Sequence, residues 1–289
     1  MAKEKEVKEE EKNAVEEDST EEKIVVEAVE ESDVVEEAPP ADDEEFAASK
    51  SDIASDYAHW NPKTEIGRKV KAAEIRDIDE ILDSGKPILE AEIVDILLPD
   101  IKSELLMIGQ SKGKFGGGAK RIFKQTQKKT REGNKPHFAT MAVVGNENGY
   151  VGIGYGKSKE TVPAREKAIR NAKLGIIKIR RGCGSWQCNC KAPHSIPFKV
   201  EGKSGSVSIK LIPAPKGNGL VVEKEVAKIL KLAGIKDVWA KSSGHTKTKT
   251  NLIKATMEAL RKLQATKVQP QHLAALNIVE GRAGAGKDE

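Results

Sequence analysis

The sequence contains no long apolar run, and no stretch approaches the roughly 18 apolar residues that a membrane-spanning helix requires. Its N-terminus also lacks the apolar core of a signal peptide, so we expect a cytoplasmic protein. Only three cysteines are present, all between residues 183 and 190, and this odd number argues against a disulfide framework. No carboxylate pair and no nucleophile with a neighbouring base stands out, which argues against an enzyme.

Positive and negative charges are unevenly distributed along the chain. Residues 1–50 contain 20 Asp and Glu and 6 Lys and Arg, so the remaining residues carry a net charge of +18. Because residues 1–51 are rich in Glu and poor in aromatic residues, we expect them to form a disordered acidic tail. The basic remainder favours a polyanionic partner. Nucleic acid is favoured over a membrane because no basic amphipathic helix carries a bulky apolar face.

The stretch between residues 120 and 181 combines cations with apolar strands. Seven Lys or Arg and one acid lie between Lys120 and Lys135. An apolar, β-favouring run at Phe138–Val144, a turn at Asn148-Gly149 and a return at Tyr150–Tyr155 predict a β-hairpin.

A basic helix is predicted after this hairpin, because Pro163 suits a first helical turn and apolar residues follow at helical spacing. In the returning strand, Gly152, Gly154 and Gly156 leave one face without side chains. We interpret the cations and this bare face as an RNA-binding surface that admits the sugar–phosphate chain. Close packing within the protein is the alternative interpretation of the glycines.

The flanking regions show weaker patterns. Before the hairpin, Ile75–Leu82 is predicted to be a helix, and short apolar runs at 93–98 and 105–108 are expected to pack outside the first domain. The second half predicts strands near 198–201, 207–211 and 235–240, and helices at 222–233 and from residue 253. The order strand, strand, helix, strand, helix indicates an α+β or split βαβ fold.

One cluster has the residue types of a metal site: Cys183, Cys188, Cys190 and His194. Three thiolates and one imidazole fill a tetrahedral structural zinc site and leave no open position for catalysis. The spacing differs from the usual paired CxxC, and reduced cysteines in an ordinary loop remain the alternative.

Two stretches have spacings similar to nucleotide-binding loops. Gly281, Gly286 and Lys287 have Walker spacing, but Asp288 stands where a hydroxyl is required and no helix follows. Near Lys157, Val151 replaces the first Walker glycine. We therefore reject the first as a nucleotide site. For the second, close packing of strand glycines is at least as favoured as a phosphate role, which would be toward RNA backbone and not toward a nucleotide.

Four segments of this chain closely resemble the small-subunit ribosomal protein five family. They are GNENGYVGIGYGKSKE (145–160) with the basic helix and RRG (180–182), PHSIPFKVEGKSGSVSIKLIPAPKGNGL (193–220), LAGIKDVWAKSSG (232–244) and TNLIKATMEAL (250–260). The resemblance runs in order from about residue 93 to residue 263, and the cysteine loop is similar to that of archaeal members.

The resemblance implies an α+β fold in which a unit like a double-stranded-RNA-binding domain precedes a βαβ-type α+β sandwich domain. It also implies a structural, non-enzymatic constituent of the small ribosomal subunit that binds 16S rRNA. Members lie near the channel through which mRNA enters, beside the fourth and eighth small-subunit proteins, and support decoding accuracy and subunit assembly. The acidic N-terminal extension lies outside this common part.

The expected domains are an acidic tail (1–51), a helical or irregular extension packing on the first domain (52–110), the RNA-binding unit (111–182), a Cys/His linker loop (183–194), the C-terminal α+β domain (195–270) and a tail (271–289). Candidate rRNA-binding residues are Lys124, Lys128, Lys129, Arg131, Gly133, Lys135, His137, Lys157, Lys159, Arg180, Arg181, Lys247 and Lys249. Candidate contacts to a neighbouring protein are Pro215, Lys216, Gly217 and Gly219.

Two other functions are alternatives, but neither fits the resemblance along the chain. One is an RNA-processing or NTP-driven enzyme that uses Lys157 or Lys287. The other is a regulatory RNA-binding module outside the ribosome, controlled by zinc at the cysteine cluster.

Overall fold

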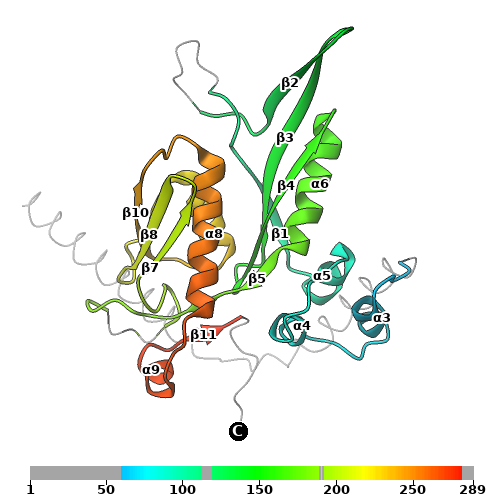
Figure 1. Ribbon diagram of the computed structural model, residues 1–289. Coiled ribbons are helices and arrows are strands. Elements are labelled where there is room, and N and C mark those ends of the chain that lie inside the picture. The colour runs from blue at the N-terminus through cyan, green and yellow to red at the C-terminus, as the bar shows by residue number, and fades with distance from the viewer. Residues whose placement is uncertain (1–59, 112–118, 189, 191, 282–289) are drawn as a thin grey trace, which may run out of the picture. The chain divides into compact units, whose positions relative to one another are not determined.

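The computed structural model describes residues 60–111, 119–188, 190 and 192–281 (Figure 1). The chain divides into two units, residues 1–52 and 53–289, and the described residues all belong to the second. The expected acidic tail, most of the glycine-rich loop before the hairpin and the C-terminal Walker-like stretch after Gly281 lie outside the described residues. Within the described ranges, no helix combines the length and apolar character needed to cross a membrane.

An antiparallel five-stranded sheet occupies the first half of the described chain (Figure 1). Its strands are β1 (Lys102–Leu106), β2 (Lys124–Thr130), β3 (Gly133–Gly145), β4 (Tyr150–Ser158) and β5 (Ile176–Lys178). The order is β1-β3-β4-β5, and β2 pairs with the first half of β3. The predicted hairpin is confirmed as β3 and β4, with Gly149 in its turn at φ 97°. Before Phe138, β3 pairs only with β2, so these two strands form an arm beyond the rest of the sheet.

Helix α6 (Thr161–Leu174) covers one face of this sheet, as predicted for the basic helix (Figure 1). A methyl group built on Gly154 would lie 2.1 Å from the backbone oxygen of Ala168, and one on Gly156 would lie 2.1 Å from that of Ala164. The helix backbone therefore fills the space that the glycines leave. The expectation that RNA occupies this face is wrong, and the alternative of close packing is confirmed.

A second, four-stranded sheet follows in the order β7-β8-β10-β9. Its elements are β7 (Val200–Ser204), β8 (Val207–Pro213), β9 (Leu220–Val221), α7 (Lys224–Leu232), β10 (Val238–Ser243) and α8 (Lys249–Ala265). Strand β9 runs parallel to β10, so β9, α7 and β10 form a βαβ crossover, whereas the other pairs are antiparallel. Helix α8 packs on β7 and β8 and buries its predicted apolar face. The fold is thus α+β with antiparallel sheets, as the sequence indicated.

One hydrophobic core joins the two sheets. Met141 and Val143 on β3 belong to the same buried cluster as Val226 and Ile229 on α7. Helix α7 contacts β1, β3 and β4, and its buried Glu225 carboxylate accepts a hydrogen bond of 2.8 Å from the Met107 backbone amide. The first sheet therefore lies between α6 on one face and the second half of the chain on the other.

Three short helices precede the first sheet: α3 (Glu65–Lys71), α4 (Ile78–Asp83) and α5 (Ala91–Leu97). They form a second apolar cluster that includes Tyr150 and Ile176 of the sheet. The predicted helix at 75–82 is only partly correct, because α4 begins at Ile78 after a cap at Asp77. The apolar runs at 93–98 and 105–108 contribute to α5 and to edge strand β1, neither of which was predicted.

The residues after 270, expected to be a tail, contain helix α9 (Pro270–Ala275) and strand β11 (Val279–Glu280) through Gly281. Strand β11 pairs with β6 (Arg180–Arg181), about 100 residues earlier in the chain. This pairing was hidden in the sequence because a two-residue strand has no detectable alternation.

Replacing Gly154 with Ala is expected to destabilise the protein by about 3 kcal/mol, because the added methyl group would overlap the α6 backbone. Thermal or denaturant unfolding of the full chain measures this change. Gly175→Ala is the matched control, since the nearest atoms to a methyl group there lie 3.4 Å away. Equal stability of the two variants would contradict the proposed close packing.

Candidate nucleic-acid interface and candidate metal centre

The arm formed by β2 and the start of β3 concentrates exposed cations. Its side chains include the exposed candidates Lys124, Lys128, Lys129, Arg131 and Lys135. Gly133 makes the sharp turn at its tip with φ 116°. Among the ion pairs of the described chain, the only one on this arm joins Lys135 to Glu132 at 2.8 Å. The arm therefore presents several exposed positive charges to solvent, which is the arrangement that phosphate binding needs.

A second basic site lies where β4 passes into α6. An open pocket of about 570 Å³ is lined by His137, Lys157, Ser158, Lys159, Glu160, Pro163 and Lys167. The structure thus brings together three predicted residues, His137, Lys157 and Lys159, and adds Lys167 from the first turns of α6. The predicted helix already placed Lys167 one turn after Pro163, but the sequence did not show which side chains of β3 and β4 it would join. The partial positive charge of the α6 N-terminus adds to the attraction for an anion.

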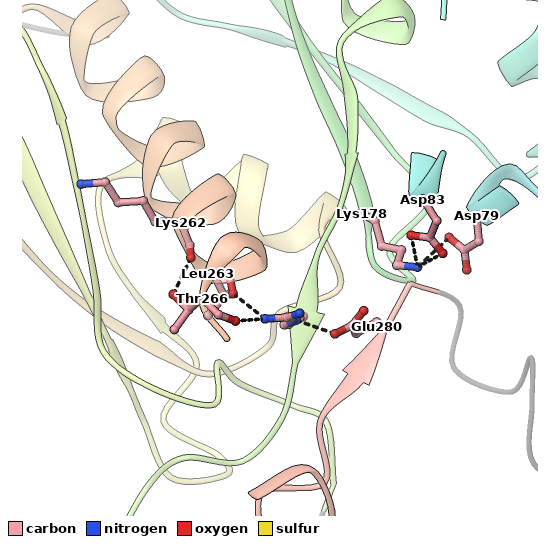
Figure 2. A network of polar contacts seen from close by, with 8 residues as sticks. Asp79, Asp83, Lys178, Lys262, Leu263, Thr266 and Glu280 are labelled. Atoms are coloured by element: carbon pink, nitrogen blue, oxygen red, sulfur yellow. Dashed lines mark hydrogen bonds and ion pairs between the residues drawn. The ribbon is translucent and has the colours of Figure 1, made fainter. Parts of the chain in front are cut away.

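Arg180 of β6 connects strand β11 with the C-terminal end of α8. Its Nε donates to Glu280 Oε1 at 2.5 Å, and its Nη1 donates to the backbone oxygens of Thr266 and Leu263 (Figure 2). These partners lie on β11 and at the end of α8. Nearby, Lys178 contacts Asp83 at 3.0 Å and Asp79 at 3.6 Å (Figure 2).

Arg181 is only 5% exposed, and burial lowers the pKa of its guanidinium. Its Nη2 donates to Asn148 Oδ1 at 2.7 Å and to the Gly281 backbone oxygen at 2.9 Å. In both Arg180 and Arg181 the guanidinium group binds the chain itself, which gives each a structural role, and an rRNA contact by either residue stays a prediction.

The two remaining basic candidates lie at the start of α8. Lys247 is exposed and its backbone oxygen accepts a hydrogen bond of 2.8 Å from Lys120 Nζ. Lys249 forms an ion pair of 2.6 Å with Glu223, the residue that caps α7. Burial, followed by the nearby positive charge of Lys249, lowers the pKa of Lys120. Lys247 thus remains available at the surface, whereas Lys249 is partly committed to an internal contact.

The four predicted metal ligands converge, with one ligand atom from each lying within 4.8 Å of all the others. The Sγ atoms of Cys183 and Cys190 are 3.6 Å apart, and Cys188 Sγ is 3.7 Å from His194 Nε2. The loop closes through an antiparallel bridge between Gly182 and Ser195. Three thiols and an imidazole in this arrangement have the donor set of a structural zinc site with no open position.

The thiols differ in their surroundings. The backbone amide of Lys216 and the neighbouring Cys190 lower the pKa of Cys188 to about 6, which favours the thiolate that binds metals. Burial raises the pKa of the Cys183 thiol to about 11. A bound cation would reverse this second effect, because metal ions stabilise coordinated thiolates.

Asp237 fixes the orientation of the histidine. Its Oδ2 lies 2.7 Å from His194 Nδ1, and both side chains are about 95% buried, with exposed fractions of 6% and 5%. This contact leaves Nε2 of His194 directed at the thiols, as in metal sites where a carboxylate holds the ligand histidine. Sequence analysis missed Asp237, because 43 residues separate it from His194 and nothing local marks it.

The predicted protein-contact loop lies on the other side of Asp237. The Gly217 and Gly219 amides donate to Asp237 Oδ1 at 3.1 and 2.8 Å. Both glycines have positive φ, 95° and 66°, which other residues rarely adopt. Lys216 and Gly217 are exposed at the tip.

The α+β fold, the basic arm and the basic pocket are typical of a nucleic-acid-binding protein. The chain belongs to the ribosomal protein S5 family, because residues 122–180 match the ribosomal protein S5 N-terminal domain and residues 202–275 match its C-terminal domain. The resemblance identified in the sequence is thereby confirmed.

Similar proteins named small ribosomal subunit protein uS5 occur in archaea. The relative from Nanoarchaeum equitans is 52% identical over 222 residues, which cover 77% of this chain and 95% of the relative. The relative from Methanocaldococcus jannaschii is 50% identical over 223 residues, 77% of this chain and 96% of the relative. The relative from Picrophilus torridus is 47% identical over 232 residues, 79% and 98% of the two chains.

Replacing Arg181 with Met is expected to lower stability by about 1–3 kcal/mol, because the Gly281 oxygen loses a buried hydrogen bond. Affinity for rRNA should be unchanged under conditions where the variant is folded. Denaturant unfolding and an rRNA binding titration measure the two effects separately. Lost affinity with intact stability would assign Arg181 to the RNA surface instead.

Proposed function

We propose that this protein is a structural, non-enzymatic constituent of the small ribosomal subunit that binds 16S rRNA in the cytoplasm. The observation that carries this proposal is membership of the ribosomal protein S5 family across both of its domains. Relatives with 52% and 50% sequence identity to this chain are named small ribosomal subunit protein uS5. Co-sedimentation of the full chain with small subunits tests the proposal, and a chain found only free of subunits would overturn it.

The basic surface gives this function a physical mechanism. The cations of the β2–β3 arm and of the pocket at the start of α6 each replace counterions on the RNA backbone, and the released counterions drive binding. The arm extends past the sheet, so it is suited to insertion between rRNA segments. A sheet covered on one face by α6, with basic groups at the arm and the helix start, supports the finer description of this half as a unit like a double-stranded-RNA-binding domain.

The second half of the chain supplies the protein contacts in this proposal. The exposed loop Pro215–Gly219 faces a neighbouring small-subunit protein, with the fourth and eighth proteins as the expected neighbours. The chain then lies near the channel through which mRNA enters and supports decoding accuracy and assembly. The motifs quoted from residues 193–260 support this placement, since they include the loop itself.

We also propose that one zinc ion binds Cys183, Cys188, Cys190 and His194. The convergence of the four ligand atoms and the carboxylate behind His194 support this assignment. The ion would stabilise the loop between the two halves of the chain. Its role is structural because all four tetrahedral positions are taken by the protein.

Replacing Lys128 and Lys129 with Gln is expected to weaken 16S rRNA binding, because two phosphate contacts are lost. The slope of log K against log salt concentration should then become less steep by about two. Titrations at a series of salt concentrations measure this slope. Lys63→Gln with Lys86→Gln is a matched control, because both lysines are exposed and lie outside the residues that match the family domains. Identical slopes for the two double variants would contradict a role for the arm.

The full-length protein is expected to retain about one zinc per chain after purification, and a Cys188→Ser, Cys190→Ser variant is expected to retain none. Elemental analysis of protein passed through a desalting column measures the content. A Ser103→Ala, Ser206→Ala variant controls for handling, since both of these residues are remote from the cluster in sequence. Absence of zinc from the wild-type chain would leave the cluster as reduced thiols.

A further inference from the structure

One carboxylate connects the metal cluster with the exposed Pro215–Gly219 loop. Asp237 Oδ2 lies 2.7 Å from His194 Nδ1, while its Oδ1 accepts hydrogen bonds from the Gly217 and Gly219 amides. One carboxylate oxygen therefore contacts the metal cluster and the other contacts the Pro215–Gly219 loop. The side chain is 6% exposed, so water offers these groups little compensation if either contact is lost.

The backbone strengthens the same connection. The amides of Lys236 and Asp237 both donate to the His194 backbone oxygen, at 2.8 and 3.1 Å. The adjacent Ser195 hydroxyl donates to the Asp237 backbone oxygen and accepts from the Ala214 amide, which begins the loop. His194 and Asp237 therefore cannot shift independently.

The loop has few other restraints. A methyl group built on Gly217 or on Gly219 would meet no atom within 4 Å, so neither backbone position is packed against the protein. The remaining hydrogen bonds are one from the Lys216 amide to the Cys188 thiol, a long one of 3.4 Å from the Asn218 amide to the Pro215 oxygen, and one of 3.2 Å from the Val238 amide to the Gly219 oxygen. The conformation of the tip therefore depends on Asp237, which holds the Gly217 and Gly219 amides, and on the contact of the Lys216 amide with Cys188.

We propose that metal binding at the cluster fixes the conformation of the Pro215–Gly219 loop, and that Asp237 is the positioning residue that transmits the effect. The inference rests on the proposed metal site. A metal on His194 Nε2 places the ring proton on Nδ1, where it is donated to Asp237 Oδ2. The carboxylate is then held with Oδ1 directed at the two loop amides. Without metal, the imidazole is held by Asp237 alone and not also by an ion at Nε2, so the ring and the carboxylate have more freedom to reorient together.

The consequence is a surface whose shape depends on metal. Metal loading would order the loop before it meets a protein partner, which reduces the conformational entropy lost on binding. The metal centre would then serve the interface as well as the connection between the two halves of the chain.

Hydrogen exchange of the Gly217 and Gly219 amides in the full-length protein tests this inference. Zinc-loaded protein is compared with protein treated with a chelator under reducing conditions. Removal of zinc is expected to accelerate exchange of these amides about 5- to 150-fold, the range of ordinary coupling energies, and added zinc should restore protection. Amides of β3 serve as an internal control and should not change. Equal exchange in the two states, with zinc content confirmed, would overturn the inference and leave the metal site standing.

Asp237→Asn provides the second arm of the test. An amide has a single acceptor oxygen, so it cannot serve both His194 Nδ1–H and the loop amides. Zinc affinity should fall about 10- to 100-fold, and the loop amides should exchange rapidly even at saturating zinc. Asp95→Asn is the matched control, because Asp95 forms an ion pair with Lys173 in another part of the protein. Full loop protection in zinc-saturated Asp237→Asn would exclude the positioning role.

If the wild-type chain retains no zinc, both the metal site and its coupling to the loop fail together, and the metal measurement identifies this case. If the Asp237→Asn variant does not fold, the comparison of loaded and chelated wild-type protein still decides the inference.

Discussion

The docking of α7 against the first sheet is the contact on which the rest of the structure depends. The helix belongs to the βαβ crossover of the second sheet, yet its apolar residues share a core with Met141 and Val143 of β3. Backbone hydrogen bonds from Glu147 and Gly149 to the end of α7 strengthen this contact. The two sheets therefore share one continuous hydrophobic core.

The cations of the chain have two separate roles. Those on the β2–β3 arm and at the start of α6 face solvent, where they can exchange counterions for phosphates. Lys178 and Arg180 instead contact carboxylates and backbone oxygens on segments distant in sequence (Figure 2). Arg181 likewise donates to Asn148 and to the Gly281 backbone oxygen. A run of basic residues therefore does not define a binding surface by itself. The contacts of each head group show which cations also have a structural role, as Arg181 does with its buried hydrogen bond to the Gly281 oxygen.

The two halves of the chain are connected by a short loop that many hydrogen bonds hold in place. A bridge between Gly182 and Ser195 closes the cysteine loop. A methyl group on Gly184 would lie only 1.9 Å from the Pro197 oxygen, so the backbone segments at Gly184 and Pro197 are in direct contact. Asp237 then links this loop to the Pro215–Gly219 loop. A metal ion at the cluster would therefore lie next to both loops.

The sequence by itself determined the local features of this protein. Alternation and helical spacing predicted the β3–β4 hairpin, α6, α7 and α8, because these patterns report which face of an element is buried. The uneven charge and the compact cysteine cluster likewise indicated a polyanionic partner and a metal site. Tertiary structure alone decided the partners: α6 against Gly152, Gly154 and Gly156, β11 beside β6, and Asp237 behind His194. These contacts join residues far apart in the chain, and no local periodicity records which distant segment will fill a given space.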